Sequence, residues 1–293
     1  MLGSILGAIS QGLIWGVMAI GVYITYKVIN ISDLTVDGSF ATGGAVFAIL
    51  VLNKFDPTLS LIIAFIAGGI CGLITGLIHT VFKIPAILAG ILTQLSLYSI
   101  NLRILGDKAN VSINFIETNI TFLSKNLNIT HSQAGMLVGF IVSVLCILII
   151  YYFLGTEMGV AFRATGNNEK MVSALGVNTN LVKVCGISLS NALVALSGAL
   201  LVEMSKYADV SMGKGAIVYG LASIVIGNAI FSKANNFGIK LFSSVIGCIV
   251  FFIIRAVVIR LGLKANDMQL ISAVIVILAL GIPEIKKMKI IKK

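Results

Sequence analysis

The sequence predicts an all-α polytopic membrane protein in which residues 1–293 form a single transmembrane domain with about nine transmembrane helices. Hydrophobic residues make up 58% of the chain and charged residues only 11%, and the mean hydropathy is +1.07. Soluble domains are about 45–50% apolar and about 25% charged. A soluble chain of this length would need more polar surface to cover its core. The apolar segments must therefore face lipid or one another.

The formal net charge of +10 does not indicate a nucleic-acid partner, because five of the 21 basic residues lie in the tail, residues 284–293. A basic tail beside an apolar segment is typical of a cytoplasmic anchor near anionic lipid. The four cysteines stand singly in apolar segments and predict small core residues, with no disulfide. The two histidines have no partner at ligand spacing, so no metal site and no cofactor are expected.

Nine segments are apolar and long enough to be considered as spans, for which about 20 residues are usual. Two of them are short, 36–52 and 216–231. The nine are 4–26, 36–52, 59–82, 84–105, 134–154, 181–204, 216–231, 238–260 and 267–283. The first is expected to be retained, because no basic region precedes it and no cleavage site follows it.

The two longest polar insertions, 106–132 and 155–180, are expected on opposite sides of the membrane, because one span separates them. Counting Lys and Arg near the span ends gives 12 on the side of 155–180 and the tail, and nine on the other. Positive charge favours the cytoplasmic side. The sequence therefore predicts that 155–180 and the C-terminus are cytoplasmic, whereas 106–132 and the N-terminus are outside.

The two short spans begin with similar sequences. "DLTVDGSFATGGAV" from Asp33 aligns loosely with "DVSMGKGAIVYGLA" from Asp209, 176 residues later. On the predicted topology the copies start from opposite sides, as an inverted repeat requires, and paired short spans often mark a transporter's binding region. The alternative is that two helix starts merely share capping residues.

Two carboxylates stand four residues apart at the start of the first copy. Asp33, beside Ser32, is expected to cap a helix near the inner surface. Asp37 lies one turn deeper, where an unpaired charge would be costly, and must have a partner. Lys27, the second repeat, and a cationic group on the transported solute are the three candidates.

Residues 155–180 are polar and compatible with helix, and on their own would predict a solvated surface helix. However, "GVAFRATGNNEKMVSALGVNTNLVKV" closely resembles the cytoplasmic coupling segment of permease subunits in ATP-binding cassette (ABC) importers of the branched-chain amino acid and ribose-type superfamily. The matching positions are Gly159, Ala161, Arg163, Ala164, Gly166, Asn168, Met171, Ala174, Leu175, Gly176, Val177 and Lys183.

Two further stretches resemble the same superfamily. "GISLSNALVALSGALLVE" is similar to the helix that follows the coupling segment, and "DLTVDGSFATGGAV" to an early half-helix. "ISDLTVDGSF" resembles a single-permease subfamily associated with tryptophan and tyrosine. Asp37 departs from the small residue that sugar permeases commonly have there, which disfavours a sugar.

The resemblance implies a permease subunit that has no catalytic residues and is not itself an enzyme. The chain lacks a G-x-x-x-x-G-K-S/T phosphate loop, so ATP hydrolysis is expected on a separate ATPase. Arg163, Glu169 and Lys170 would supply polar contacts to that ATPase, and Met158, Phe162, Met171 and Leu175 apolar anchors. The complete predicted contact set is Glu157, Met158, Gly159, Phe162, Arg163, Ala164, Gly166, Asn168, Glu169, Lys170, Met171, Leu175 and Gly176.

The resemblance also implies partners and a place in the cell. These are a second permease copy in a homodimer, two ATPase copies, and an extracytoplasmic solute-binding protein or lipoprotein, all at a bacterial cytoplasmic membrane. The 106–132 insertion is a candidate docking surface for the solute-binding protein, and a plain loop is the alternative.

A transported amino acid needs partners for its ammonium and carboxylate groups. Asp37 is the first candidate for the ammonium. The full set of predicted pathway residues is Asp37, Thr35, Ser39, Gln94, Ser96, Tyr207, Asp209 and Ser211. These residues could instead be structural, with specificity set by the binding protein. The alternative functions are a sugar or nucleoside ABC permease and an ion-coupled secondary transporter, although the latter leaves 155–180 unexplained.

Overall fold

The computed structural model describes residues 2–232, 236–261, 270, 272–274, 277 and 281. Among these residues, six helices are long and apolar enough to cross a membrane, and two apolar helices are shorter. The six are α1 (Leu2–Tyr23, continued by the π-helix η1, Ile24–Ile29), α3 (Pro57–Val81), α4 (Ala86–Ile104), α6 (His131–Gly155), α9 (Thr179–Ser205) and α11 (Phe237–Arg260). The short ones are α2 (Val36–Leu52) and α10 (Ala216–Ile230).

These eight helices match eight of the nine predicted spans to within a few residues. The ninth prediction, 267–283, is described at only six positions, and the tail 284–293 lies outside the described residues. The sequence did not predict the π-helix that ends the first span, nor the short elements of the 106–132 insertion. Those elements are β1 (Asn110–Ser112) and α5 (Asn119–Asn126).

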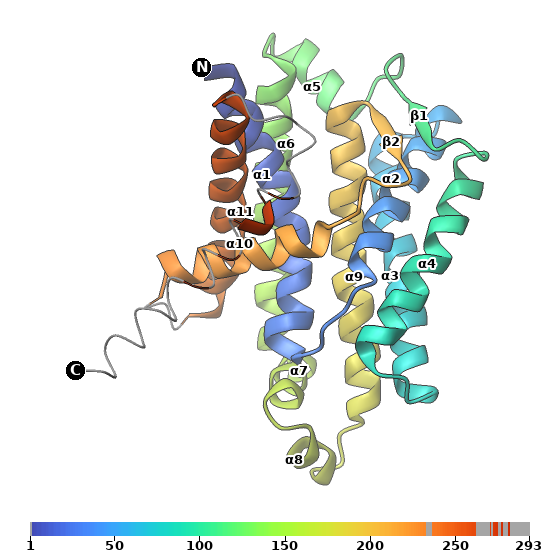
Figure 1. Ribbon diagram of the computed structural model, residues 1–293, viewed down its shortest axis with the longest axis vertical. Coiled ribbons are helices and arrows are strands. Elements are labelled where there is room, and N and C mark those ends of the chain that lie inside the picture. Colours follow the sequence, from blue (N-terminus) through green and yellow to red (C-terminus); the bar gives the residue numbers. More distant parts are fainter. Residues whose placement is uncertain are drawn as a thin grey trace.

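The two polar insertions lie at opposite ends of the bundle, as predicted. Figure 1 shows β1, α5 and β2 (Tyr207–Asp209) at one end, and α7 (Glu157–Asn167) and α8 (Glu169–Ala174) at the other. We call these the β-ribbon end and the α7–α8 end. Strands β1 and β2 pair antiparallel, with Asn110 opposite Asp209, so the insertion is tied to the segment that follows α9.

Helix α9 packs closely against α3, because α3 presents a stripe of small side chains along one face. The buried residues of α3 are Ser60, Ala64, Gly68, Cys71, Gly72, Thr75 and Gly76. Small residues let two membrane helices approach closely, which matters because the hydrophobic effect does not drive association inside lipid. The opposite face of α3 carries exposed Leu and Ile side chains, as expected for contact with lipid.

An aromatic cluster joins α1, α2, α10 and α11 in the core. Trp15 stacks on Phe40 with ring centroids 4.5 Å apart, and its ring also meets Tyr219 at 5.3 Å and Phe252 at 5.6 Å. Such offset and edge-to-face pairs each add about 0.5–1.5 kcal/mol beyond the area they bury. The cluster therefore fixes where both short helices sit against α1.

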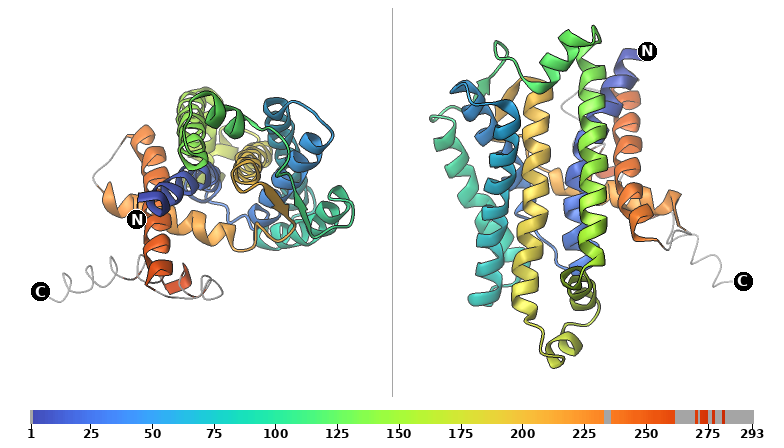
Figure 2. Two further views of the ribbon diagram at one scale, coloured as in Figure 1. Left: turned by 90° about the horizontal axis from the view of Figure 1, so that it is seen from above. Right: turned by 180° about the vertical axis from the view of Figure 1, so that it is seen from behind.

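The two short helices agree with the predicted inverted repeat in one respect and differ in another. The chain reaches α2 from the α7–α8 end and α10 from the β-ribbon end, as predicted. However, α2 runs along the bundle, whereas α10 lies across the long helices (Figures 1 and 2). The reason lies in its packing, because Tyr219 of α10 contacts Trp15 of α1 and Phe252 of α11.

Candidate functional site

Asp37 in the first turn of α2 holds the start of α10. Its Oδ2 accepts a hydrogen bond from the Gly215 backbone N–H at 2.8 Å, and its Oδ1 accepts one from the Ile217 N–H at 3.0 Å. The partial positive charge of a helix N-terminus favours a carboxylate there. Of the three partners that the sequence left open for Asp37, the structure therefore shows the second repeat.

The backbones on the two sides of this contact are also close. A Cβ added at Gly213 would lie 1.9 Å from the Asp37 carbonyl oxygen, so only glycine fits at that position. Together with the two hydrogen bonds, this contact ties the start of α2 to the start of α10. We call this arrangement, formed by Asp37, Gly213, Gly215 and Ile217, the half-helix latch.

Asp33 holds the turn that leads into α2, but it does so in the protein interior. Its Oδ1 accepts from the Thr35 N–H at 2.8 Å, and its Oδ2 accepts from Asn191 Nδ2 of α9 at 2.6 Å. The residue is 3% exposed. Asp33 thus satisfies a backbone N–H at the start of α2, as predicted for a cap, while its location near the inner surface stays a prediction.

A cavity of about 200 Å³ opens beside the half-helix latch, between α2, α4 and the segment before α10. It brings together two predicted pathway residues, Asp37 and Gln94, with Tyr98 and Lys214, which the sequence analysis missed. Tyr98 could have been found, since it lies four residues after Gln94 and thus on the same helix face. Lys214 gave no signal beyond its neighbouring glycines.

The other predicted pathway residues do not line this cavity. Thr35 and Ser39 are fully buried, and the Thr35 hydroxyl shares a hydrogen bond with that of Thr75 at 2.8 Å. The Ser96 hydroxyl donates back to the Leu92 carbonyl. The last three, Tyr207, Asp209 and Ser211, lie in or just after β2. The Ser211 N–H donates to Asp209 Oδ1, and Tyr207 lines a different cavity.

The α7–α8 segment projects from the bundle with apolar side chains in the open. Met158, Met171 and Leu175 are 42%, 52% and 75% exposed, as expected for anchors that contact a partner. Phe162 is only 1% exposed, because its ring packs edge-to-face on Phe153 inside the bundle. The prediction of a surface anchor is therefore wrong for Phe162, which instead fastens α7 to α6.

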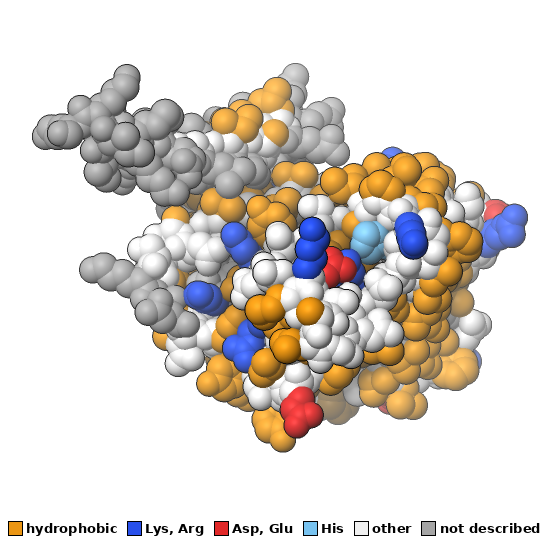
Figure 3. Space-filling view, turned by 90° about the horizontal axis from the view of Figure 1, so that it is seen from below, with side chains coloured by type: hydrophobic (Ala, Val, Ile, Leu, Met, Phe, Trp, Pro, Cys, Tyr) orange, Lys and Arg blue, Asp and Glu red, His pale blue; other side chains and the backbone are white. Residues whose placement is uncertain are grey.

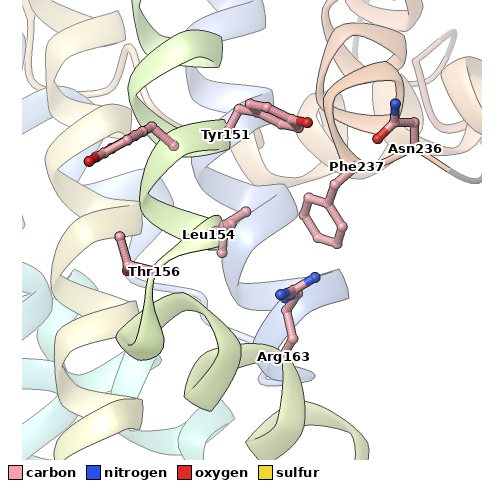
Figure 4. Close-up of a pocket in the computed structure, with 8 residues that line it drawn as sticks. Tyr151, Leu154, Thr156, Arg163, Asn236 and Phe237 are labelled. Atoms are coloured by element: carbon pink, nitrogen blue, oxygen red, sulfur yellow. The ribbon is translucent and has the colours of Figure 1, made fainter.

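Arg163 turns toward the bundle. Its guanidinium carbon lies 5.8 Å from the centre of the Phe237 ring, within the range of a cation–π contact. Figure 4 shows this side chain pointing at Phe237, in a cavity of about 530 Å³ between α6, α7 and the start of α11. Arg163 thus links the α7–α8 segment to α11.

Glu169 is also held within the chain. Its Oε1 accepts from Lys183 Nζ of α9 at 2.5 Å and from the Thr179 hydroxyl at 3.4 Å. The hydrogen bond from Lys183 stabilises the carboxylate and lowers the pKa of Glu169 below its ordinary value. The pair fixes α8 to the start of α9.

Replacing Glu169 with glutamine is expected to lower stability slightly, by about 0.2–1 kcal/mol or less, because the carboxylate is half exposed. The folded-state pKa is depressed, so the stabilisation is fully present above the ordinary pKa of 4.5 and is lost as the pH falls below it. Melting temperatures of wild type and variant in detergent should differ at neutral pH and converge in acid. A difference that persisted in acid would contradict the assignment.

Helix α7 comes very close to the backbone of the π-helix at Gly166. A Cβ added at Gly166 would lie 1.9 Å from the Val28 carbonyl oxygen, which belongs to η1. The residue after η1, Asn30, has the left-handed backbone angles φ 60° and ψ 43°, and the chain then turns back toward Asp33 and Asp37. A movement of α7 would therefore displace η1 and the segment that follows it, which contains Asp37 of the half-helix latch.

The α7–α8 end is basic. Figure 3 shows Lys and Arg side chains across this face with apolar side chains between them. Six basic residues lie in the elements and turns of this end: Lys27, Lys83, Arg163, Lys170, Lys183 and Lys240. In the part of the chain that the structure describes, the acidic residues of α7 and α8 are Glu157 and Glu169. No three His, Cys, Asp or Glu side chains of that part are placed to hold a metal ion.

Comparison with known proteins gives a consistent picture. A family model described as branched-chain amino acid transport system, permease component, matches residues 4–280. A tyrosine transport system permease protein of Clostridioides difficile is 35% identical over 94% of this chain and 90% of its own length. A ribose import permease protein of Escherichia coli is 23% identical over 95% of this chain and 84% of its own. No solved structure matches.

Proposed function

Because the chain belongs to the family of branched-chain amino acid transport system permease components, we propose that it forms the solute pathway of an ABC importer for an aromatic amino acid. The family consists of permease components of ABC-type transporters. The relative named for tyrosine is more similar to this chain than the one named for ribose, with 35% against 23% identity. An aromatic amino acid is therefore favoured over a sugar.

The α7–α8 segment is the observation that carries this proposal. It projects from one end of the bundle, with exposed Met158, Met171 and Leu175 beside basic side chains. Apolar anchors with a polar rim are typical of a protein interface. The partner we propose is the ATPase of the importer, one copy for each permease of a homodimer, which places the α7–α8 end on the cytoplasmic side of a bacterial inner membrane.

Gly166 is the position at which a displacement of α7 by the ATPase would be transmitted to the bundle. With no Cβ in the way, α7 rests on the Val28 carbonyl, and η1 continues into the segment that ends at Asp37. Packed elements transmit displacement because protein interiors are close to incompressible. ATP-driven movement of α7 would thus reach the half-helix latch through η1 and residues 30–34, which Asp33 ties to Thr35 and to Asn191 of α9.

The β-ribbon end is then external and is the docking surface for a solute-binding protein or lipoprotein. The 106–132 insertion exposes Phe115 fully and Phe122 by 58%, and aromatic side chains are enriched at interfaces. A secondary carrier with coupled carboxylates is less well supported. Asp33 and Asp37 are each engaged separately, one with Thr35 and Asn191 and the other with α10.

Replacing Met171 and Leu175 together with serine is expected to abolish co-purification of the ATPase proposed as the partner of this permease. Loss of two exposed anchors removes a few kcal/mol of apolar contact at about 25 cal/mol per Å². The permease itself should keep its melting temperature, because both side chains are exposed.

The matched control is Leu127→Ser, which changes a side chain 54% exposed at the other end of the molecule. Its ATPase yield should equal that of wild type. Undiminished ATPase binding by the double variant would show that the α7–α8 segment is not the docking site.

A further inference from the structure

The cavity shown in Figure 4 lies where the apolar run of α6 ends, away from the half-helix latch. Its volume of about 530 Å³ falls within the roughly 300–1,000 Å³ of small-molecule sites. The residues that line it come from α6, α7 and the start of α11, and are Tyr151, Tyr152, Leu154, Gly155, Thr156, Arg163, Asn236 and Phe237. We call it the Arg163 cavity.

The Arg163 guanidinium has no carboxylate partner in the part of the chain that the structure describes. The ion pairs of these residues are Lys125 with Glu117 and Lys183 with Glu169. The Arg163 Nε is buried and donates to no acceptor there. None of the eight lining residues is acidic, and Glu157 at the start of α7 is not among them. The cavity therefore holds a partly buried positive charge that an anion would stabilise.

Other hydrogen-bond donors surround the same space. Figure 4 shows Arg163 rising toward the Phe237 ring from α7, with Asn236 and Tyr151 on the opposite side of the cavity. Asn236 makes no side-chain cap for α11, so its amide NH₂ is available. Tyr151 and Tyr152 add two hydroxyl groups on side chains that are 47% and 79% exposed. A planar guanidinium held over a ring, with amide and hydroxyl donors around it, suits the oxygens of a phosphate group.

Exposed apolar side chains lead up to the cavity on both α6 and α11. Leu145 and Leu148 of α6 are 51% and 58% exposed, and Tyr152 follows Leu148 by four residues on the same helix face. On α11, Ile239 and Phe242 are 41% and 44% exposed. Tyrosine at the end of a membrane helix is typical of the headgroup level of the bilayer. A ligand can therefore place a phosphate at the guanidinium and acyl chains along these two helices.

We propose that the Arg163 cavity binds the phosphate of an anionic phospholipid, such as phosphatidylglycerol, whose acyl chains lie along α6 and α11. Basic pockets between membrane helices bind anionic headgroups in this way. The bound lipid bridges α7 to α6 and α11, so the position of α7 depends on the composition of the membrane. The site goes beyond the proposed function, because lipid binding requires neither ATP nor a transported solute.

Lipid binding can be measured on the permease alone. Full-length protein is purified in detergent, stripped of endogenous lipid and titrated with phosphatidylglycerol or with zwitterionic phosphatidylcholine. Native mass spectrometry then counts the lipids bound to each chain. One tightly bound phosphatidylglycerol is expected for each chain. Phosphatidylcholine carries the same phosphate with a compensating cation, and should bind about tenfold more weakly.

Arg163→Gln removes the charge that holds the phosphate and should weaken phosphatidylglycerol binding about tenfold. Its matched control is Arg103→Gln, which removes an exposed arginine from the last turn of α4, at the β-ribbon end. The control should keep the wild-type affinity.

Asn236→Asp tests the cavity without removing the contact between Arg163 and Phe237. Asn236 is exposed, and aspartate is as good an N-cap as asparagine, so α11 should still form. The new carboxylate repels the phosphate and should weaken phosphatidylglycerol binding about tenfold. Asn178→Asp is the control, because Asn178 also begins a helix at the α7–α8 end but does not line the cavity. It adds the same charge and should leave the affinity unchanged.

Three results would overturn the inference. The first is equal affinity for the two lipids, or wild-type affinity in Asn236→Asp. The second is displacement of the lipid by inorganic phosphate at equal concentration, which would show a site for the free anion. The third is an Asn236→Asp protein that keeps its lipid but no longer co-purifies with the ATPase, which would assign the cavity to the protein interface. Failure of solute uptake would refute the proposed function and leave the lipid site standing.

Discussion

Replacing Asp37 with asparagine is expected to destabilise the protein by about 1–3 kcal/mol and to abolish solute uptake. Each of the two Asp37 carboxylate oxygens accepts a different backbone N–H of α10, from Gly215 and Ile217. Asparagine has one acceptor oxygen, and its NH₂ group would face a second N–H donor. The start of α10 would lose a hydrogen bond and the favourable charge at its N-terminus.

Asp56→Asn is a matched control for this variant. Asp56 also caps a helix, but a single oxygen, Oδ1, accepts from both Thr58 N–H and Leu59 N–H, and the residue is exposed. Asparagine can reproduce that geometry and is as good an N-cap as aspartate. Melting temperature in detergent and uptake should therefore both stay near wild type. Unchanged uptake in Asp37→Asn would contradict a role for the half-helix latch in transport.

Replacing Gly166 with alanine is expected to leave ATPase binding intact but to abolish ATP-driven uptake. The added Cβ would lie 1.9 Å from the Val28 carbonyl oxygen, so α7 must move away from η1. Overpacking of this kind typically costs about 1–3 kcal/mol, more than the roughly 1 kcal/mol that alanine gains over glycine in a helix. The exposed anchors Met171 and Leu175 are unaffected, so the ATPase should still dock.

Gly155→Ala is the control, because a Cβ at that position meets nothing within 4 Å. This variant should be as active as wild type. The measurement is the ratio of solute transported to ATP hydrolysed in reconstituted vesicles. A wild-type ratio in Gly166→Ala would show that force does not pass through the contact between α7 and η1.

Much of the fold could be predicted from local composition, because a membrane helix is specified by a run of apolar residues. The bounds of α2 agree with the prediction, and those of α3 and α10 differ from it by at most two residues at either end. The opposite placement of the two polar insertions followed from the single span between them. The crosswise direction of α10 could not be predicted, because it depends on the packing of Tyr219 against Trp15 and Phe252.

The candidate site was predicted less completely, because side-chain partners come from distant parts of the chain. Asp37 could be predicted as a site residue because burying an unpaired charge costs free energy. Its partners could not be predicted, because they are backbone N–H groups 178 and 180 residues away, which any residue type would supply. Phe162 matched a surface anchor by residue type, yet its ring is buried. Lys214 was missed because a cavity between three elements depends on packing, whereas Tyr98 could have been found from its position four residues after Gln94.

The pairing of β1 with β2 has a thermodynamic consequence for the whole transporter. Asn110 opposite Asp209 joins the 106–132 insertion to the strand whose continuation ends at Gly215, while Gly166 packs α7 on the segment that ends at Asp37. Contacts from the two opposite ends of the bundle thus lead to the same pair of hydrogen bonds, those that Asp37 accepts from Gly215 and Ile217. Linkage is reciprocal, so in the proposed transporter a binding protein that alters the affinity for the ATPase must have its own affinity altered by the same factor.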